Sequence, residues 1–284
     1  MKYTKDIEKL EFFSNEARKD IIKMIYKAKS GHPGGSLSCI DILVCLYHSV
    51  MDITLDDNLK RKDKFILSKG HAAPAYYAIL SQMGFIPRKD LVTLRKYNSY
   101  LEGHPSNKIF GVDVSSGSLG QGVSIANGMA MAKKLSKDDG YVYVLVGDGE
   151  IEEGQVWEAF MTTSKYNLNN MILIIDKNNL QIDGSVEQVK NIKVIDEKLN
   201  AFGFNVINAN GHDFKDLSIA FKEAKMSTKP SCIIAHTIKG KGISFMENMV
   251  SWHGKSLNDE EYEKAMKELG GAIWNQQEKH LVNF

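Results

Sequence analysis

Residues 141–149 read YVYVLVGDG and residues 171–179 read MILIIDKNN, and these two stretches decide the fold of the chain. Each begins with a short run that is apolar almost throughout, which is typical of a strand buried on both faces. Helical patterns flank them at about 121–135, 155–166 and 194–202. Alternation of such strands with helices predicts a parallel sheet with helices on both faces.

The rest of the chain continues this alternation. Further strands are predicted at 65–68, 205–209 and 231–236, and further helices at 6–28, 37–50, 72–83 and 214–225. Residues 30–35, SGHPGG, concentrate helix breakers and are predicted to form a loop. No repeat or linker divides residues 1–284, so we expect a single α/β domain with a doubly wound, mostly parallel sheet.

Composition excludes several classes of protein. The chain has 284 residues, with 36 Lys and Arg against 35 Asp and Glu, a net charge of +1. This balance supplies no strong field for a polyanion, so non-specific nucleic-acid binding is not expected. Its three cysteines form no CxxC pair, which argues against a disulfide framework. With no signal peptide and no apolar run near the ~20 residues that span a bilayer, we expect a cytoplasmic protein.

The turns that follow the two decisive strands carry potential metal ligands. Ligands bind at the carboxyl ends of strands in parallel sheets, and here Asp148 and Asn178 follow two strands that are expected to be neighbours. Carboxylate and amide oxygens suit Mg²⁺, which often shares its coordination with phosphates. Gly149 would let a diphosphate approach the backbone. The alternative is a pair of unrelated turns, because GDG is also a common turn sequence.

Four of the eight histidines lie in glycine-rich loops: His32, His71, His104 and His253. A lone histidine is more often structural than catalytic. Four in such loops of one domain suggest a site, because imidazole can donate, accept and change charge near neutral pH. A substrate with several hydroxyls or a migrating proton would use them.

The other histidines give weaker signals. His48 falls on an apolar helix face and His280 near the end of the chain, and both are expected to be structural. His212 precedes Asp213, a predicted helix N-cap, and is expected to lie in a turn. The role of His236, at a strand end, stays open.

Residues 117–122, GSLGQG, open a predicted helix. Their glycine order and their position do not match a dinucleotide-binding fingerprint, and they lack the spacing of a P-loop. They supply a flexible backbone at a helix start, suited to lying against a flat ring or a phosphate.

Together these segments resemble the N-terminal, diphosphate-binding region of transketolase, a thiamine-diphosphate enzyme. The resemblance runs from residue 30 to residue 254, and its motifs are SGHPGG, SKGHAA, GHPS, GSLGQG, the GDG…N pair, HTIKGKGISFMEN and WHG. GDG…N alone would indicate only thiamine diphosphate. The SGHPGG, GHP and WHG loops favour transketolase over a 2-oxo-acid dehydrogenase.

The resemblance implies a bound thiamine diphosphate and Mg²⁺. The metal ligands would be Asp148, Asn178 and the main-chain carbonyl of Leu180. The backbone of Gly149 would face the diphosphate, and the segment Gly117, Ser118 and Leu119 would lie against the cofactor. Ser118 stands where many relatives have proline, a small departure.

The resemblance also implies roles for the loop histidines. His32 and His253 would be catalytic, reaching the sugar's hydroxyls and shuttling protons, with His253 also near the cofactor. His71 would contact cofactor and substrate, and His104 would hydrogen-bond the two-carbon adduct. Glu153 and Glu158 match acidic residues near the family's dimer interface, and ordinary charges at a helix N-terminus are the alternative.

Transketolases continue into pyrimidine-binding and C-terminal domains, which residues 1–284 do not contain. The glutamate that activates the cofactor belongs to the pyrimidine domain. The resemblance therefore implies the N-terminal subunit of a split transketolase, forming a heterotetramer with a C-terminal subunit. It would move a two-carbon ketol unit from a ketose, expected to be a phosphate, to an aldose, as in the pentose phosphate pathway.

Three alternatives stay open. The complex could act on a branched, sulfonated or unphosphorylated ketose. It could form deoxyxylulose phosphate from pyruvate, against which His32 and His104 argue. The chain could be a non-catalytic scaffold, which an intact Asp148 and Asn178 disfavour. The sequence leaves open the two sugars, the partner and stoichiometry, dimerisation or cofactor binding by the chain alone, and the role of residues 271–284 with Trp274.

Overall fold

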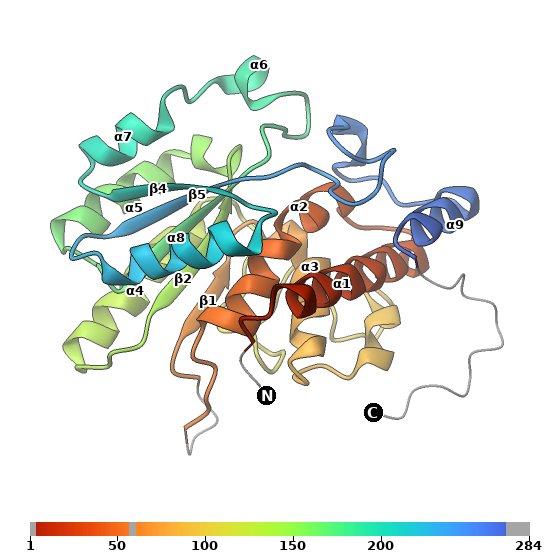
Figure 1. The fold of residues 1–284 in the computed structure, drawn as a ribbon, viewed down its shortest axis with the longest axis horizontal. Helices are drawn as coiled ribbons and strands as arrows, with labels where there is room; N and C mark the ends of the chain where they lie inside the picture. The colour runs from red at the N-terminus through yellow and green to blue at the C-terminus, as the bar shows by residue number, and fades with distance from the viewer. Residues whose placement is uncertain (1–3, 57–60, 271–284) are drawn as a thin grey trace.

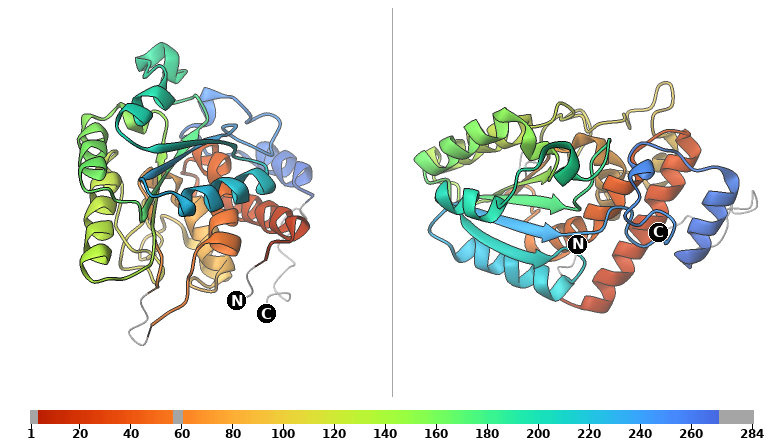
Figure 2. Two further views of the ribbon diagram at one scale, coloured as in Figure 1. Left: turned by 60° about the vertical axis from the view of Figure 1, so that its left-hand side comes forward. Right: turned by 90° about the horizontal axis from the view of Figure 1, so that it is seen from above.

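The computed structural model of the chain describes residues 4–56 and 61–270. A central sheet lies between two layers of helices (Figure 1, Figure 2). Its strands are all parallel, in the order β1-β2-β3-β5-β4. They are β1 (Lys64–Leu67), β2 (Val142–Gly147), β3 (Met171–Lys177), β4 (Asn205–Asn210) and β5 (Ser231–His236). The predicted doubly wound parallel α/β fold is confirmed.

The helices divide between the two faces of the sheet. One face packs against α1 (Ile7–Ala28), α2 (Pro33–Cys45), α3 (Ala73–Gln82) and α8 (Phe214–Met226), with α9 (Asp259–Glu268) against α1. The other face packs against α4 (Gln121–Leu135), α5 (Gly154–Lys165) and α7 (Ile195–Ala201). The short α6 (Val186–Lys190) connects β3 to α7, in a stretch for which the sequence predicted no helix.

Burial on both faces explains why the central strands are apolar throughout. Val142, Val144 and Val146 of β2 belong to the core beneath α4 and α5, whereas Tyr143 and Leu145 belong to the core beneath α2 and α8. Successive side chains of a strand point to opposite faces, so both sets must be apolar.

The predicted loop at residues 30–35 is wrong in its second half, because Pro33, Gly34 and Gly35 form the first turn of α2. Proline is favoured at the first helical position, where its missing N–H costs nothing. Packing requires the first of these glycines, because a Cβ at Gly34 would lie 2.9 Å from the carbonyl oxygen of Trp252. The second predicted helix reaches Val50 as expected, but residues 46–50 form a π-helical turn that continues α2.

The segment after β5 returns across the molecule to α2 and α1, as the blue trace in Figure 1 shows. Gly240 N–H donates to the carbonyl of Gly34 at 3.1 Å, and Arg18 Nε donates to the carbonyl of Lys241 at 3.1 Å. This path places Lys239 and His253 over the N-terminus of α2. Residues 271–284, including Trp274, lie outside the described residues, as does His280.

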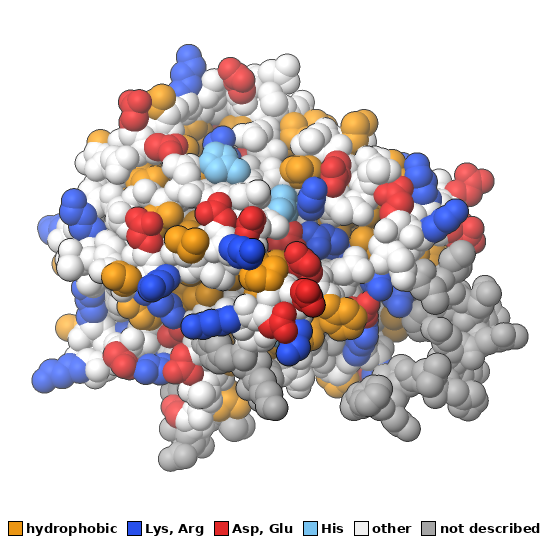
Figure 3. Space-filling view, viewed as in Figure 1, with side chains coloured by type: hydrophobic (Ala, Val, Ile, Leu, Met, Phe, Trp, Pro, Cys, Tyr) orange, Lys and Arg blue, Asp and Glu red, His pale blue; other side chains and the backbone are white. Residues whose placement is uncertain are grey.

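The visible surface carries charges of both signs. Acidic and basic side chains are interspersed on the face shown in Figure 3, without a broad patch of one sign. The three cysteines are buried and unpaired. Over the described ranges, no helix has both the length and the apolar character needed to cross a membrane.

Candidate active site

The predicted metal ligands lie at the carboxyl ends of adjacent strands. Gly147 of β2 pairs in register with Asp176 of β3, so Asp148 and Asn178 follow neighbouring strand ends. Both side chains are largely buried, with 6% and 7% of their surface exposed. The Asp148 carboxylate accepts the N–H groups of Gly149, at 2.9 Å, and of Asn179. A carboxylate offers about four acceptor positions, so two remain for a further ligand.

The surroundings of Asp148 make its charge costly without a cation. Burial, and then the charge of Asp176, raise the pKa of Asp148 to about 7. A buried carboxylate of this kind favours a bound cation, because the cation stabilises the charged form.

The third predicted ligand, the carbonyl of Leu180, is turned toward the same region. It accepts a hydrogen bond from Lys239 Nζ at 3.2 Å, and the Leu180 N–H donates to Asn178 Oδ1 at 3.1 Å. Carboxylate, amide and carbonyl oxygens from two neighbouring turns form a donor set suited to Mg²⁺. Among the described residues no cluster of three His, Cys, Asp or Glu could hold a metal, and this mixed oxygen set does not require one.

Three of the four predicted histidines form one cluster. The ring centroids of His32 and His71 are 5.2 Å apart, those of His71 and His253 5.3 Å, and those of His32 and His253 5.6 Å. Lys239 Nζ lies 2.8 Å from His253 Nδ1. An ammonium group can only donate, so Nδ1 accepts and the ring proton of His253 is on Nε2. His32 Nδ1 is buried and has no hydrogen-bond partner among the described residues, which leaves it available to a ligand.

These imidazoles are neutral at physiological pH. Burial, followed by the positive charge of Arg95, lowers the pKa of His32 to about 4. Burial, followed by Lys239, lowers the pKa of His253 to about 3. Burial also holds the pKa of His71 well below its ordinary value, with Lys69 as the next cause. Neutral imidazoles can accept a proton from a substrate hydroxyl or donate a hydrogen bond to it.

His104, the fourth histidine, lies beside the GSLGQG segment, residues 117–122. A Cβ at Gly117 would be in ordinary van der Waals contact with the ring of His104, at 3.5 Å, so the two segments are neighbours. Gly117 N and the Ser116 hydroxyl pack against Gly70, next to His71. Ser118 and Leu119 continue this segment and are exposed and half-buried, respectively.

Sequence reasoning missed a buried carboxylate that holds these loops together. Glu150, 3% exposed, accepts the N–H of Gly120 at 2.9 Å, the N–H of Gly147 at 3.0 Å and the hydroxyl of Ser68 at 2.5 Å. It therefore ties the turn after β1, the start of α4 and the end of β2. The only signal was an acidic residue directly after GDG, which a surface turn would also show.

A second missed group lies beneath the site. Lys69 Nζ bonds to Asp176 Oδ2 and donates to the carbonyl of Gly35 at 2.8 Å. Ser38 and Thr237 donate to the same carboxylate. Burial alone would raise the pKa of Asp176, but the Lys69 charge and these hydrogen bonds hold it below its usual value. The sequence did offer one signal for this ion pair: Asp176 is a charged residue near the end of an otherwise apolar strand.

Lys239 also escaped the sequence analysis. Burial, and then repulsion by Lys69, lower the pKa of Lys239 to about 8. Besides Leu180 and His253, its Nζ contacts the carbonyl of Gln181 at 3.5 Å. A cation held this close to the predicted metal ligands could neutralise a diphosphate. A lysine in a KGKG stretch does not distinguish this role from a surface charge.

The remaining histidines lie outside the cluster. His48 stacks on Phe13, with ring centroids 4.2 Å apart, which fits the predicted structural role. His236 Nε2 bonds to Asn208 Oδ1 at 2.7 Å on the neighbouring strand. His212 is more than a turn residue: it bonds to Asp41 at 2.7 Å and accepts the N–H of Ile238 at 2.8 Å.

The acidic pair predicted near an interface is not in the site either. Glu153 precedes α5 as its N-cap residue and Glu158 lies within the helix, and both are exposed. Their role at an interface stays a prediction.

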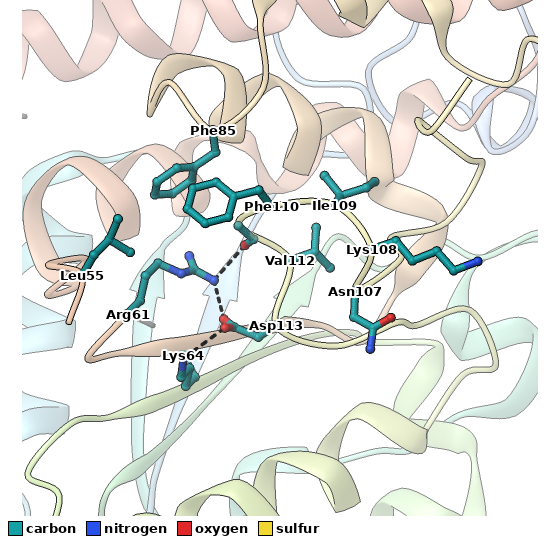
Figure 4. A pocket seen from close by; sticks show the side chains of 11 residues that line it. Leu55, Arg61, Lys64, Phe85, Asn107, Lys108, Ile109, Phe110, Val112 and Asp113 are labelled. Atoms are coloured by element: carbon teal, nitrogen blue, oxygen red, sulfur yellow. Dashed lines mark hydrogen bonds and ion pairs between the residues drawn. The ribbon is translucent and has the colours of Figure 1, made fainter. Parts of the chain in front are cut away.

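A separate cavity of about 430 Å³ lies at the opposite edge of the sheet, beside the start of β1 (Figure 4). Arg61 points to Asp113, and Lys64 pairs with the same carboxylate at 3.4 Å (Figure 4). The aspartate therefore engages both cations, and the cavity lies away from the carboxyl ends of the strands. It contributes nothing to the candidate site.

The chain is similar to known proteins over nearly its whole length. The family model "Transketolase, thiamine diphosphate binding domain" matches residues 12–283. The chain is 41% identical to one of the subunits of apulose-4-phosphate transketolase from Phocaeicola vulgatus, covering 94% of this chain and 96% of that protein. It is 38% identical to "6-deoxy-6-sulfo-D-fructose transketolase subunit SqwG" of a Clostridium species, and the match covers 92% of this chain and 96% of that protein. The crystal structure of transketolase from Campylobacter jejuni superimposes with a TM-score of 0.87 at 36% identity.

The chain belongs to the transketolase family, as a transferase subunit that carries the thiamine-diphosphate-binding domain. It spans 43% of the Campylobacter transketolase and of the mammalian transketolases, but 96% of the Phocaeicola apulose-4-phosphate transketolase subunit. The chain thus matches nearly the whole of that subunit and less than half of the single-chain transketolases. These findings confirm the resemblance inferred from the sequence, together with the thiamine-diphosphate-binding fold.

Proposed function

We propose that this chain is the cofactor-holding subunit of a two-chain transketolase. With a subunit that supplies the pyrimidine-binding domain, it would transfer a two-carbon ketol unit from a ketose to an aldose. The observation that carries the proposal is the cluster of three neutral imidazoles, with ring centroids 5.2–5.6 Å apart, one of which contacts the Lys239 ammonium beside Leu180.

The oxygen ligands and Lys239 would hold the cofactor's charged end. Asp148, Asn178 and the Leu180 carbonyl would bind Mg²⁺, whose charge would help to neutralise the diphosphate. Lys239 would add a second cation, and the backbone of Gly149 would approach the diphosphate. Gly117, Ser118 and Leu119 would lie against the ring. When bound, thiamine diphosphate supplies a carbanion that attacks a carbonyl, a chemistry that no protein side chain provides.

The histidines would serve the sugar. His32 would accept and return a proton at the hydroxyl or carbonyl oxygen that changes when the carbon–carbon bond breaks or forms. His253, whose free ring atom is the Nε2–H donor, would give its proton to that oxygen and recover it. His71 would orient both cofactor and substrate, and His104 would hydrogen-bond the retained two-carbon unit. Their neutral state suits this work, because an imidazolium could not accept a proton.

Calorimetric titration of thiamine diphosphate with Mg²⁺ tests the proposal. The titration is made into this chain alone and into its mixture with the pyrimidine-domain polypeptide encoded beside it. We expect binding to tighten in the mixture, with ketol transfer only there. Full activity of the isolated chain would refute the division of labour, and absence of binding in both states would favour a scaffold.

The similarity to the apulose-4-phosphate and sulfofructose transketolases supports a second candidate, a two-chain transketolase for a non-standard ketose. A donor screen with the mixed subunits separates the two. It would compare xylulose 5-phosphate, apulose 4-phosphate, sulfofructose and unphosphorylated fructose. Pyruvate belongs in the same screen, because its turnover would point to a different thiamine-diphosphate reaction.

A heterotetramer in the cytoplasm, serving pentose-phosphate-type sugar metabolism, completes the proposal. Glu153 and Glu158 on the α5 side would lie near the interface between subunits. Sedimentation of the mixed subunits would give their stoichiometry.

A further inference from the structure

His212, in the turn between β4 and α8, is hydrogen-bonded at both ring nitrogens. Its Nε2 accepts the N–H of Ile238 at 2.8 Å, and its Nδ1 lies 2.7 Å from Asp41 Oδ2. Because Nε2 accepts a backbone N–H, the ring proton is on Nδ1, which donates to the aspartate. The imidazole therefore connects α2 to the segment that follows β5.

Asp41, the partner of this histidine, is a buried carboxylate with 4% of its surface exposed. It also accepts from Arg18 Nη2 at 2.5 Å and from the hydroxyl of Ser14, both on α1. Burial alone would raise the pKa of Asp41, but the charge of Arg18 and the hydrogen bonds from His212 and Arg18 hold it below its usual value. A charged carboxylate held by α1 thus fixes the orientation of the imidazole.

The cluster holds the backbone on both sides of Lys239. His212 accepts the N–H of Ile238, one residue before the lysine. Arg18 Nε donates to the carbonyl of Lys241, two residues after it, at 3.1 Å. Two groups that bond to the same aspartate therefore determine the path of the chain through Lys239.

The turn that follows Lys239 is tightly defined. Gly240 has a φ of 80°, and a Cβ there would lie 2.4 Å from the carbonyl oxygen of Met246. The N–H of Asn248 donates to the carbonyl of Lys239 at 2.9 Å. A close-packed turn of this kind transmits a shift at one end to the residues within it.

The side chain of Lys239 depends on this backbone for its position. It is 1% exposed, and its Nζ contacts the carbonyls of Leu180 and Gln181 and the Nδ1 atom of His253. Over the described ranges it forms no ion pair within 4.0 Å, in contrast to Lys69. A long, rotamer-rich side chain without an ion pair is located chiefly by where its backbone places it.

We infer that His212 is a positioning residue: it fixes the backbone before Lys239 and so places the lysine ammonium beside the Leu180 carbonyl and His253. It touches none of the proposed metal ligands and acts through the lysine. The use of Lys239 for a diphosphate rests on the proposed function, whereas the coupling of His212 to Lys239 does not.

Lysine labelling of the full chain tests the coupling without cofactor or partner. Reductive methylation followed by mass spectrometry gives the rate at each lysine. His212→Leu should raise the rate at Lys239 about tenfold or more through local opening, and leave the rate at Lys69, which is 2% exposed, within about twofold. His236→Leu, the same change at a histidine outside the cluster, should alter neither rate.

His212→Gln is the conservative variant, since its amide oxygen can accept the N–H of Ile238, and its rate at Lys239 should lie between wild type and His212→Leu. If the leucine variant does not fold, the glutamine variant must still label faster at Lys239 than the wild type. Equal acceleration at Lys239 and Lys69, or none at either, would overturn the inference.

A double-mutant cycle in the mixed subunits tests the consequence for cofactor binding. The dissociation constant of thiamine diphosphate with Mg²⁺ is measured calorimetrically in the presence and absence of Lys239→Met. His212→Gln should weaken binding about fivefold when Lys239 is present and less than twofold when it is replaced. Equal weakening in both backgrounds would contradict action through Lys239. Absence of binding by the wild type would count against the proposed function, and the labelling rates would still decide the role of His212.

Discussion

Each clustered histidine owes its proton affinity to its surroundings. Burial is the main cause of the low pKa of His32 and of His253, and neighbouring cations add to it. Because Lys239 donates to Nδ1 of His253, the Nε2–H of that ring is left as a donor. The site therefore presents fixed hydrogen-bonding groups without a positive charge on the rings.

Removal of either proposed proton-transfer group should affect turnover more than cofactor binding. His32→Ala and His253→Ala are expected to lower kcat of the mixed subunits about 100-fold or more, as for a general acid–base group. The dissociation constant of thiamine diphosphate should change only a few-fold. Steady-state kinetics and calorimetry measure the two quantities. His236→Ala is the control, because its ring bonds to Asn208, outside the cluster. Unchanged turnover would remove both residues from the mechanism.

Acid should destabilise the free chain partly through His32. Its pKa is lowered to about 4 in the folded chain, against about 6.5 when unfolded, so only the unfolded state takes up this proton between these values. The stability linked to the neutral ring is present above pH 6.5 and is lost progressively toward pH 4. In metal-free buffer, the free energy of unfolding of His32→Gln should fall less steeply from pH 7 to pH 5 than that of the wild type. Urea titrations at each pH measure it, and parallel slopes would contradict the expectation.

At the scale of elements, the ion pair of Lys69 and Asp176 joins the turn after β1 to β3. Both side chains are buried, and Ser38 of α2 and Thr237 after β5 bond to the same carboxylate. Four elements thus share one buried charge, which is stable only while it is paired.

Lys69→Met should leave the Asp176 charge without its cation and destabilise the chain by about 3–5 kcal/mol. Lys62→Met is the matched control, since Lys62 pairs with Asp139 on the surface, where solvent screens the charges. The control should unfold at nearly the wild-type urea concentration. A similar loss in both variants would show that the buried pair has no special weight.

At the scale of the whole molecule, the site joins loops whose residues run from 30 to 254 in the sequence. Parallel strands bring the turns after β1, β2, β3 and β5 to one edge, and the segment after β5 brings Lys239 and His253 back to α2. A ligand that contacts all these loops binds the folded chain and not the unfolded one, and so stabilises it.

Thiamine diphosphate with Mg²⁺ should therefore raise the melting temperature of the mixed subunits. At about 100 times the dissociation constant the stabilisation is about 2.7 kcal/mol, which corresponds to roughly 5–10 °C for a chain of this size. Chelation of the metal, or Asp148→Asn, should remove most of the shift. Asp183→Asn, at an exposed loop position, should retain it. Scanning calorimetry measures the shift, and a full shift in Asp148→Asn would exclude that carboxylate as a metal ligand.

The sequence by itself was sufficient for the parallel α/β fold, for the pairing of Asp148 with Asn178 and for the clustering of His32, His71 and His253. Apolar strands, glycine-rich turns and motif spacing are local signals, and the strand ends of a parallel sheet must lie on one edge. Lys69, Glu150 and Lys239 were identified only in the tertiary structure. A charged residue in a turn has the same local pattern whether it is solvated or buried, and only packing decides which.

Packing also decided the helical start of α2. The breakers at 33–35 oppose a helix interior, but Pro33 is at the first position, and the close approach of Trp252 to Gly34 leaves room for no side chain. His212 is a similar case, since its partner Asp41 lies 171 residues away in the chain. Contacts between distant segments leave no mark on local sequence pattern, so the tertiary structure alone decided them.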